Sequence, residues 1–118
     1  GIPVFWVESN KLQGIDAVID KDLASSLLAI EIKADMFIIL TDIPKVFTNF
    51  HKPDEKALDR MSVAEAKKLL AENHFSEGSM APKVRACIQF CEKTGKEALI
   101  TMANELGKSG AGTIIYAE

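Results

Sequence analysis

The amino-acid sequence predicts an α/β fold in which a largely parallel sheet is flanked by helices. Two observations lead to this prediction. Apolar stretches of strand length alternate along the chain with stretches whose apolar residues recur at helical spacing. One strand-length stretch, residues 36–40, is a run of five apolar residues. Such a run is typical of a strand that is covered on both faces of a parallel sheet.

The first expected element is a buried strand at residues 2–7, which are almost all apolar, with Phe5 and Trp6 in the core. A turn or short hairpin is expected at residues 12–16, because they include Gly14. A second short strand, at Val18 and Ile19, is expected to lead into the first helix.

The first helix is expected over residues 20–33, with Leu23, Leu27 and Ile30 along its apolar face. After the strand at residues 36–40, residues 43–61 are expected to be irregular, because their charge is mixed and they include two prolines.

A second helix is expected to start at Ser62 and to run to about Asn73, because Ser62 and Glu65 form a capping box. A third helix begins around Pro82 and ends at Gly95. The remaining expected elements are a strand at residues 98–102, a short helical turn at residues 104–108 and a strand at residues 113–117.

Composition narrows the possible functions. The 118 residues are enough for one domain with a real core, and 47% hydrophobic residues are ordinary for a globular protein. A net charge of −3 argues against a general nucleic-acid binder. No apolar run approaches the roughly 20 residues that span a bilayer. Cys87 and Cys91 share one helix face and are expected to be reduced thiols in the core of a cytoplasmic protein.

Three other signals are set aside. The segment at residues 107–109 reads Gly-Lys-Ser, but Met102 stands where a P-loop needs its first glycine. His51 and His74 lack clustered ligands, so surface or loop positions are expected for them rather than a metal site.

Lys83 lies near the start of the third helix, where a cation is mildly unfavourable unless an anion is also bound. Lys21 occupies a similar position in the first helix, between Asp20 and Asp22, two residues suited to the start of a helix. Each lysine could simply be solvated, and Asp20 could simply cap its helix. Two such helix starts together favour a site for phosphate groups.

The expected fold would place both lysines and the end of the most apolar strand in one crevice. Ligands of parallel sheets bind outside the carboxyl ends of the strands. Thr41 and Asp42 end the most apolar strand, and the strand at residues 18–19 is expected to bring Lys21 to the same edge. Lys21, Asp22, Thr41, Asp42 and the turn before Lys83 are therefore expected to lie together.

These segments together resemble the C-terminal, nucleotide-binding part of carbamate kinase, in the amino-acid kinase superfamily. They occur in the family's order and span essentially the whole chain. They are GIPV at 1–4, AVIDKDLA at 17–24, IILTD at 38–42, NF at 49–50 with KPDEK at 52–56, Phe75 with GSM at 78–80 and PKV at 82–84, and GAGT at 110–113.

The resemblance implies an enzyme of arginine metabolism in the cytoplasm that transfers a phosphoryl group between ATP and carbamate. It makes ATP from carbamoyl phosphate and ADP, with Mg²⁺ bridging the phosphates and no protein ligand assigned to the metal. The family is homodimeric. No nucleic-acid or membrane partner is implied.

The resemblance also implies roles for particular residues. Lys21 and Lys83 would contact nucleotide phosphates and stabilise transition-state charge, with Asp22 orienting both lysines. Thr41 and Asp42 would line the nucleotide site. Further nucleotide contacts are expected from Asp20, Asn49, Phe50, Gly78, Ser79, Met80 and Pro82.

The family's N-terminal lobe, with its glycine-rich loops, has no counterpart in these residues, and Gly1 resembles the tail of one such loop. The chain is therefore expected to be one domain of a longer kinase, with little or no turnover on its own. Two alternatives stay open: another member of the amino-acid kinase superfamily, or a non-catalytic nucleotide-binding module. The Asp20-Lys21-Asp22 run favours carbamate kinase over other branches.

Overall fold

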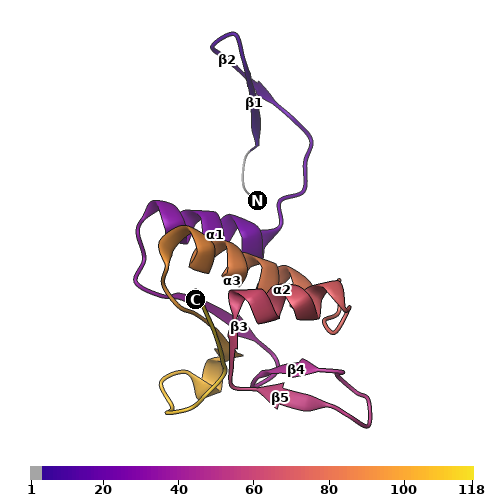
Figure 1. Ribbon diagram of the computed structural model, residues 1–118. Helices are drawn as coiled ribbons and strands as arrows, with labels where there is room; N and C mark the ends of the chain where they lie inside the picture. The colour runs from indigo at the N-terminus through magenta and orange to yellow at the C-terminus, as the bar shows by residue number, and fades with distance from the viewer. Residues whose placement is uncertain (1–3) are drawn as a thin grey trace.

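The computed structural model describes residues 4–118, in which a four-stranded sheet carries helices along one side (Figure 1). The strand order is β3-β7-β8-β6. Neighbours pair in parallel at β3–β7 and β6–β8 and antiparallel at β7–β8, so the expected mostly parallel α/β sheet is confirmed. The bounds are β3 Phe37–Thr41, β6 Arg60–Ser62, β7 Ala98–Met102, β8 Thr113–Tyr116, α1 Lys21–Glu31, α2 Val63–Ala71 and α3 Met80–Thr94.

Strand β3 is buried on one face rather than two. Phe37 and Ile39 pack into the core, where the Phe37 ring lies 5.6 Å from that of Phe90 on α3. Ile38 and Leu40 point the other way and are 41% and 48% exposed. The apolar run therefore predicted the strand but not its burial, because within the described residues its second face lacks a covering layer.

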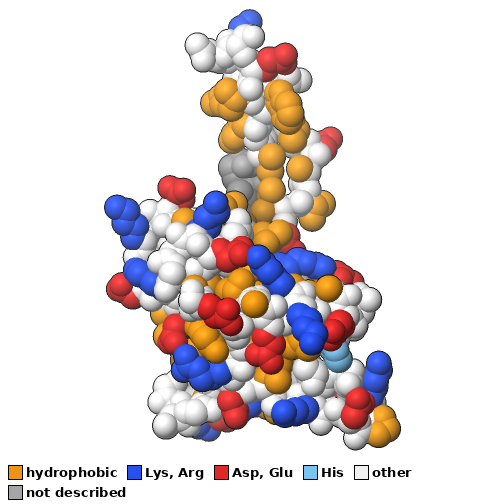
Figure 2. All heavy atoms as spheres, in the orientation of Figure 1, with side chains coloured by type: hydrophobic (Ala, Val, Ile, Leu, Met, Phe, Trp, Pro, Cys, Tyr) orange, Lys and Arg blue, Asp and Glu red, His pale blue; other side chains and the backbone are white. Residues whose placement is uncertain are grey.

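The N-terminal residues form a projecting hairpin instead of a core strand. Strands β1 (Phe5–Glu8) and β2 (Lys11–Gly14) pair antiparallel and extend away from the helices (Figures 1 and 2). Phe5 and Trp6 are 54% and 59% exposed, so the prediction that they belong to the core is wrong for the described residues. Residues 2 and 3 of the expected strand lie outside the described residues.

Helix α1 buries a different face from the one expected. Asp22, Ser26 and Ala29 are its buried residues, whereas Leu23 and Leu27 are exposed. Small side chains let α1 lie close against α3, and the Ser26 hydroxyl donates a 2.8 Å hydrogen bond to the Ala86 carbonyl there. The helix ends at Glu31, and residues 15–20 before it form no strand, so the strand predicted at residues 18–19 is absent.

The segment predicted to be irregular, residues 43–61, contains three short strands. β4 (Val46–Thr48) and β5 (Lys56–Leu58) form an antiparallel hairpin, and β6 joins the main sheet beside β8. The prediction was wrong because strands of three residues are too short to show a period, and β6 finds its partner more than 50 residues along the chain.

The later elements follow the sequence closely. The Ser62 hydroxyl caps α2 by accepting a 3.2 Å hydrogen bond from the Glu65 amide. Gly95 ends α3 in the left-handed conformation, with φ of 69°. Strand β7 has the predicted bounds, and the expected helical turn is a 3₁₀ turn at Ala103–Glu105.

The two cysteines of α3 are buried free thiols, as predicted. Burial raises the pKa of Cys91 to about 11 and raises that of Cys87 further, so both thiols stay protonated near neutral pH. Among the described residues, no helix is long and apolar enough to cross a membrane.

Gly112 offers a test of close backbone packing. Its φ is +77°, and a Cβ there would lie 2.6 Å from the Ile100 carbonyl oxygen. Gly110 has a similar φ of +73° but open space around it. We expect Gly110→Ala to lower the free energy of unfolding by about 1 kcal/mol and Gly112→Ala by about 3 kcal/mol. Urea unfolding followed by circular dichroism would measure both. Equal losses would contradict the packing argument.

Candidate functional site

The starts of helices α1 and α3 are joined by an ion pair. The Lys83 ammonium on α3 lies 3.0 Å from the Asp22 Oδ2 atom on α1, and the two side chains are only 13% and 12% exposed. A pair this poorly solvated needs both partners, because either charge alone would be costly to bury. The pair therefore fixes where the two helix starts lie relative to each other.

Lys21 approaches the same carboxylate from the other side. Its ammonium lies 3.5 Å from the Asp22 Oδ1 atom, while most of its side chain, 81%, is exposed. The structure thus brings together Lys21, Asp22 and Lys83, as the sequence predicted. Two ammonium groups share one carboxylate, so the cluster carries a net positive charge beside two helix N-termini, an arrangement that attracts anions. The catalytic roles of these residues stay predictions.

Asp20 has a local structural function. Its carboxylate accepts a 2.9 Å hydrogen bond from the Leu23 amide and so caps α1. The cap starts the helix at Lys21, and one turn later the hydrogen bond from Ser26 to α3 holds the helix in place. The orientation of Asp22 therefore follows from contacts on both sides of it in the sequence.

The start of α3 is organised by two serines. The hydroxyls of Ser76 and Ser79 are hydrogen-bonded to each other, and the Ser76 carbonyl accepts a 2.9 Å hydrogen bond from the Ala81 amide. The Ser79 side chain, at the N-cap position, makes no capping bond to the helix. Pro82 lies in the first turn, where a proline is tolerated.

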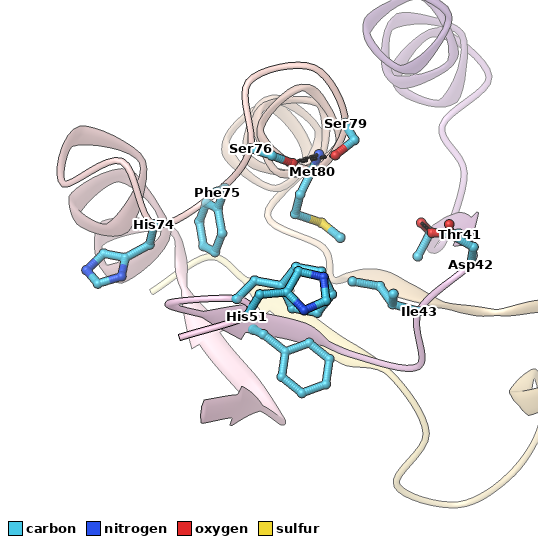
Figure 3. A pocket seen from close by; sticks show the side chains of 11 residues that line it. Thr41, Asp42, Ile43, His51, His74, Phe75, Ser76, Ser79 and Met80 are labelled. Carbon is cyan, nitrogen blue, oxygen red and sulfur yellow. Dashed lines mark hydrogen bonds between the residues drawn. The ribbon is translucent and has the colours of Figure 1, made fainter. Parts of the chain in front are cut away.

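A pocket of about 340 Å³ opens between the end of β3, the β4–β5 hairpin and the start of α3 (Figure 3). In Figure 3, Phe75 and Met80 point across the pocket toward His51 and Ile43, and Thr41 and Asp42 lie at one end. The lining residues are Thr41, Asp42, Ile43, Phe47, Phe50, His51, His74, Phe75, Ser76, Ser79 and Met80.

The lining includes some of the residues expected to bind nucleotide and leaves out others. Thr41, Asp42, Phe50, Ser79 and Met80 are part of it. The remaining four lie elsewhere: Asp20 caps α1, Gly78 and Pro82 flank the α3 start, and the Asn49 amide donates a hydrogen bond to the Asp54 carboxylate.

The sequence interpretation missed part of the aromatic wall. The Phe50 ring lies 3.9 Å from the His51 ring and 5.6 Å from the Phe47 ring, measured between centroids. His51 and His74 are loop residues, as expected, but both line the pocket. Phe75 is buried although it lies in a loop. Apolar and aromatic residues clustered beside turn residues were the available signal.

The pocket combines two kinds of surface. Its aromatic wall suits a flat ring, while the hydroxyls of Thr41, Ser76 and Ser79 can donate hydrogen bonds to an anionic group. Met80 lines the pocket, and Lys83 lies one helical turn further along α3. The positive cluster therefore lies at the helix start that forms one wall of the pocket.

Comparison with known protein families gives a match. The chain matches the amino acid kinase family over residues 4–102, which is most of its length. The chain belongs to the amino acid kinase family. Its fold and its order of elements are those of this family.

Among its relatives, a carbamate kinase of Thermoplasma volcanium is 53% identical over 98% of this chain, and one of Trichomonas vaginalis is 52% identical over 86% of it. A solved structure of carbamate kinase from Giardia lamblia, bound to AMP-PNP, superposes with a TM-score of 0.89 at 42% identity over 97% of this chain. The resemblance to carbamate kinases is thereby confirmed. The chain spans 38%, 32% and 37% of the lengths of these three relatives.

Because the Asp22 carboxylate pairs with a poorly solvated lysine, its replacement by a neutral amide should destabilise the fold more than the same change at an exposed ion pair. Asp22→Asn would leave the Lys83 ammonium poorly solvated beside a neutral amide, so we expect it to lower the free energy of unfolding by roughly 2 kcal/mol. Glu105→Gln is the matched control, because Glu105 pairs with the exposed Lys108 and should cost less than about 0.5 kcal/mol. Chemical denaturation would measure both. Similar small losses would show that the Asp22 pair contributes little to stability.

Proposed function

We propose that this chain supplies the nucleotide-binding half of a phosphotransferase that makes ATP and carbamate from carbamoyl phosphate and ADP. The observation that carries the proposal is the sharing of the Asp22 carboxylate by Lys21 and Lys83 at the start of the helix that forms a wall of the pocket. Carbamate kinases about half identical to the chain support the choice of substrate.

The pocket would hold the nucleotide. Its volume of about 340 Å³ falls in the range of small-molecule sites. The rings of Phe50 and His51 offer a stacking surface for the base. The hydroxyls of Ser76 and Ser79 would face the phosphates, at the positive end of the α3 dipole. Thr41 and Asp42 would close the end of the pocket at β3.

The lysines would act on the transferred group. In phosphoryl transfer the bond from phosphorus to the carbamoyl oxygen breaks while a bond to a terminal ADP oxygen forms. Negative charge is spread over the oxygens of the group in transit. The ammonium groups of Lys21 and Lys83 would stabilise this charge, and Asp22 would hold Lys83 in position before the nucleotide binds.

Residues 4–118 contain no cluster of three or more His, Cys, Asp or Glu side chains that could hold a metal ion. Mg²⁺ is commonly bound by substrate phosphates together with only one or two carboxylates. That a Mg²⁺ ion arrives with the nucleotide and is bound through phosphate oxygens stays a prediction from the family resemblance.

The expected low turnover of these 118 residues alone is part of the proposal. The chain corresponds to 38% of the length of the Thermoplasma relative, so a carbamate site outside this stretch would be required. Dimer formation, arginine metabolism and a cytoplasmic location stay predictions from the family resemblance.

Two other functions remain as alternatives. Another amino acid kinase would share the fold but act on a different acceptor, and the Asp20-Lys21-Asp22 run together with the carbamate kinase relatives favours carbamate. A non-catalytic nucleotide-binding module would bind ADP in the pocket without phosphoryl transfer. In the full-length protein, an assay of ATP formation from carbamoyl phosphate and ADP separates a carbamate kinase from both alternatives.

The first functional prediction concerns Lys83. In the full-length protein, Lys83→Ala should lower kcat for ATP formation by about a hundredfold or more, because stabilisation of transition-state charge is lost. Lys108→Ala removes an exposed lysine far along the chain and should leave kcat unchanged. A luciferase-coupled assay with carbamoyl phosphate and ADP measures both. Unchanged turnover in Lys83→Ala would remove this residue from the mechanism.

The second functional prediction concerns Phe50. Phe50→Ala should weaken ADP binding to the full-length protein about tenfold, since base stacking on an aromatic ring contributes about 1–3 kcal/mol. Phe5→Ala is the control, because Phe5 is an exposed aromatic residue on the projecting β1–β2 hairpin. Titration calorimetry gives both dissociation constants. Equal constants for the two variants would argue against a base stacked on Phe50.

A further inference from the structure

Thr113, the first residue of β8, is joined to both strands of the β4–β5 hairpin. Its hydroxyl accepts a 2.8 Å hydrogen bond from the Val46 amide and donates one of 2.5 Å to the Leu58 carbonyl. Val46 and Leu58 are partners in the register of the hairpin, at the end opposite its loop. One hydroxyl therefore closes the base of the hairpin and connects it to the main sheet.

The hairpin carries an aromatic wall of the pocket. Phe47 lies on β4, and Phe50 and His51 lie in the loop beyond it. Figure 1 shows β4 and β5 at one side of the molecule, apart from the helices. A small rotation at the base of the hairpin would move the rings at its far end, because these rings lie several residues from the anchor.

Thr113 is itself held in place by its neighbours. It is completely buried, and Gly112 before it packs against the Ile100 carbonyl and the Thr101 side chain. The Ile114 amide after it donates a 2.9 Å hydrogen bond to the Asp59 carbonyl. A buried hydroxyl with fixed backbone on both sides has little freedom to move, so it is a rigid anchor for the hairpin.

We propose that Thr113 is a positioning residue for the nucleotide pocket, acting through the β4–β5 hairpin. This proposal rests on the proposed function, because it takes the pocket to be the site of the nucleotide. Thr113 lines no part of the pocket and acts by setting where the rings of Phe47, Phe50 and His51 lie. Its hydroxyl affects binding of the nucleotide base rather than the transfer step.

The decisive variant is Thr113→Val, which keeps the shape of the side chain and removes the hydroxyl. It leaves the Val46 amide and the Leu58 carbonyl without their shared hydrogen-bond partner. Because an unpaired buried polar group is costly, the base of the hairpin is expected to shift so that these groups can form other hydrogen bonds. Thr113→Ser is the rescue variant, because it restores a hydroxyl at the same position. Thr101→Val is the matched control, since Thr101 is equally buried but its hydroxyl has no hydrogen-bond partner.

The experiment measures KM for ADP and kcat in the full-length protein, together with NMR signals of the His51 ring in the absence of nucleotide. The Phe50 ring lies against this ring at a tilt of 44°, so the His51 signals report the position of the aromatic wall. For Thr113→Val we expect KM to rise about tenfold with kcat within about twofold of the parent, and the His51 signals to shift or broaden. Thr113→Ser should restore both, and Thr101→Val should change neither.

The outcomes separate the two proposals. If the parent protein binds ADP and Thr113→Val changes neither KM nor the His51 signals, Thr113 has no positioning role. A proportional loss of kcat in Thr113→Val and Thr101→Val would also overturn it, since general destabilisation would then explain the effect. If the parent protein fails to bind ADP, the proposed function falls, while a shift of the His51 signals in Thr113→Val alone would still support the anchor.

Discussion

The arrangement of this site depends on one poorly solvated ion pair, between Asp22 at the start of α1 and Lys83 in the first turn of α3. The pair joins two helices that also touch through the small residues Ser26 and Ala86. Because these contacts set the relative position of the helices, Asp22 can serve Lys21 and Lys83 at once. A lysine at a helix start is unfavourable in isolation, and here a carboxylate from a neighbouring helix offsets that cost.

Much of the fold could be predicted because its signals are local. A capping box marked α2, and helical spacing of apolar residues marked α3. The predictions of burial failed where the burial of a side chain depends on which part of the chain packs against it in the folded protein. In α1 the apolar Leu23 and Leu27 are exposed, while Asp22 and Ser26 are buried, since small or paired side chains fit against α3.

The candidate site also contains some residues that local sequence signals indicate and others that they do not. Residues near helix starts and strand ends, such as Lys83 and Thr41, could be found from position alone. The aromatic wall could not, because it depends on short strands that pair with distant parts of the chain and on a hairpin loop. Within that loop Asn49 and His51 adopt positive φ angles of 51° and 63°. Residues other than glycine rarely adopt positive φ, so the sequence alone does not predict the path of this loop.

The projecting β1–β2 hairpin has a consequence for spectroscopy. Trp6 is the single tryptophan of the chain, and it lies on β1. Figure 1 shows the β1–β2 hairpin projecting away from the sheet and the helices. The fluorescence of its indole will therefore change when another surface covers the hairpin. It will change little when a ligand binds near Phe50. Intrinsic fluorescence would follow the docking of another surface onto the hairpin, and an extrinsic label is needed to follow ligand occupancy.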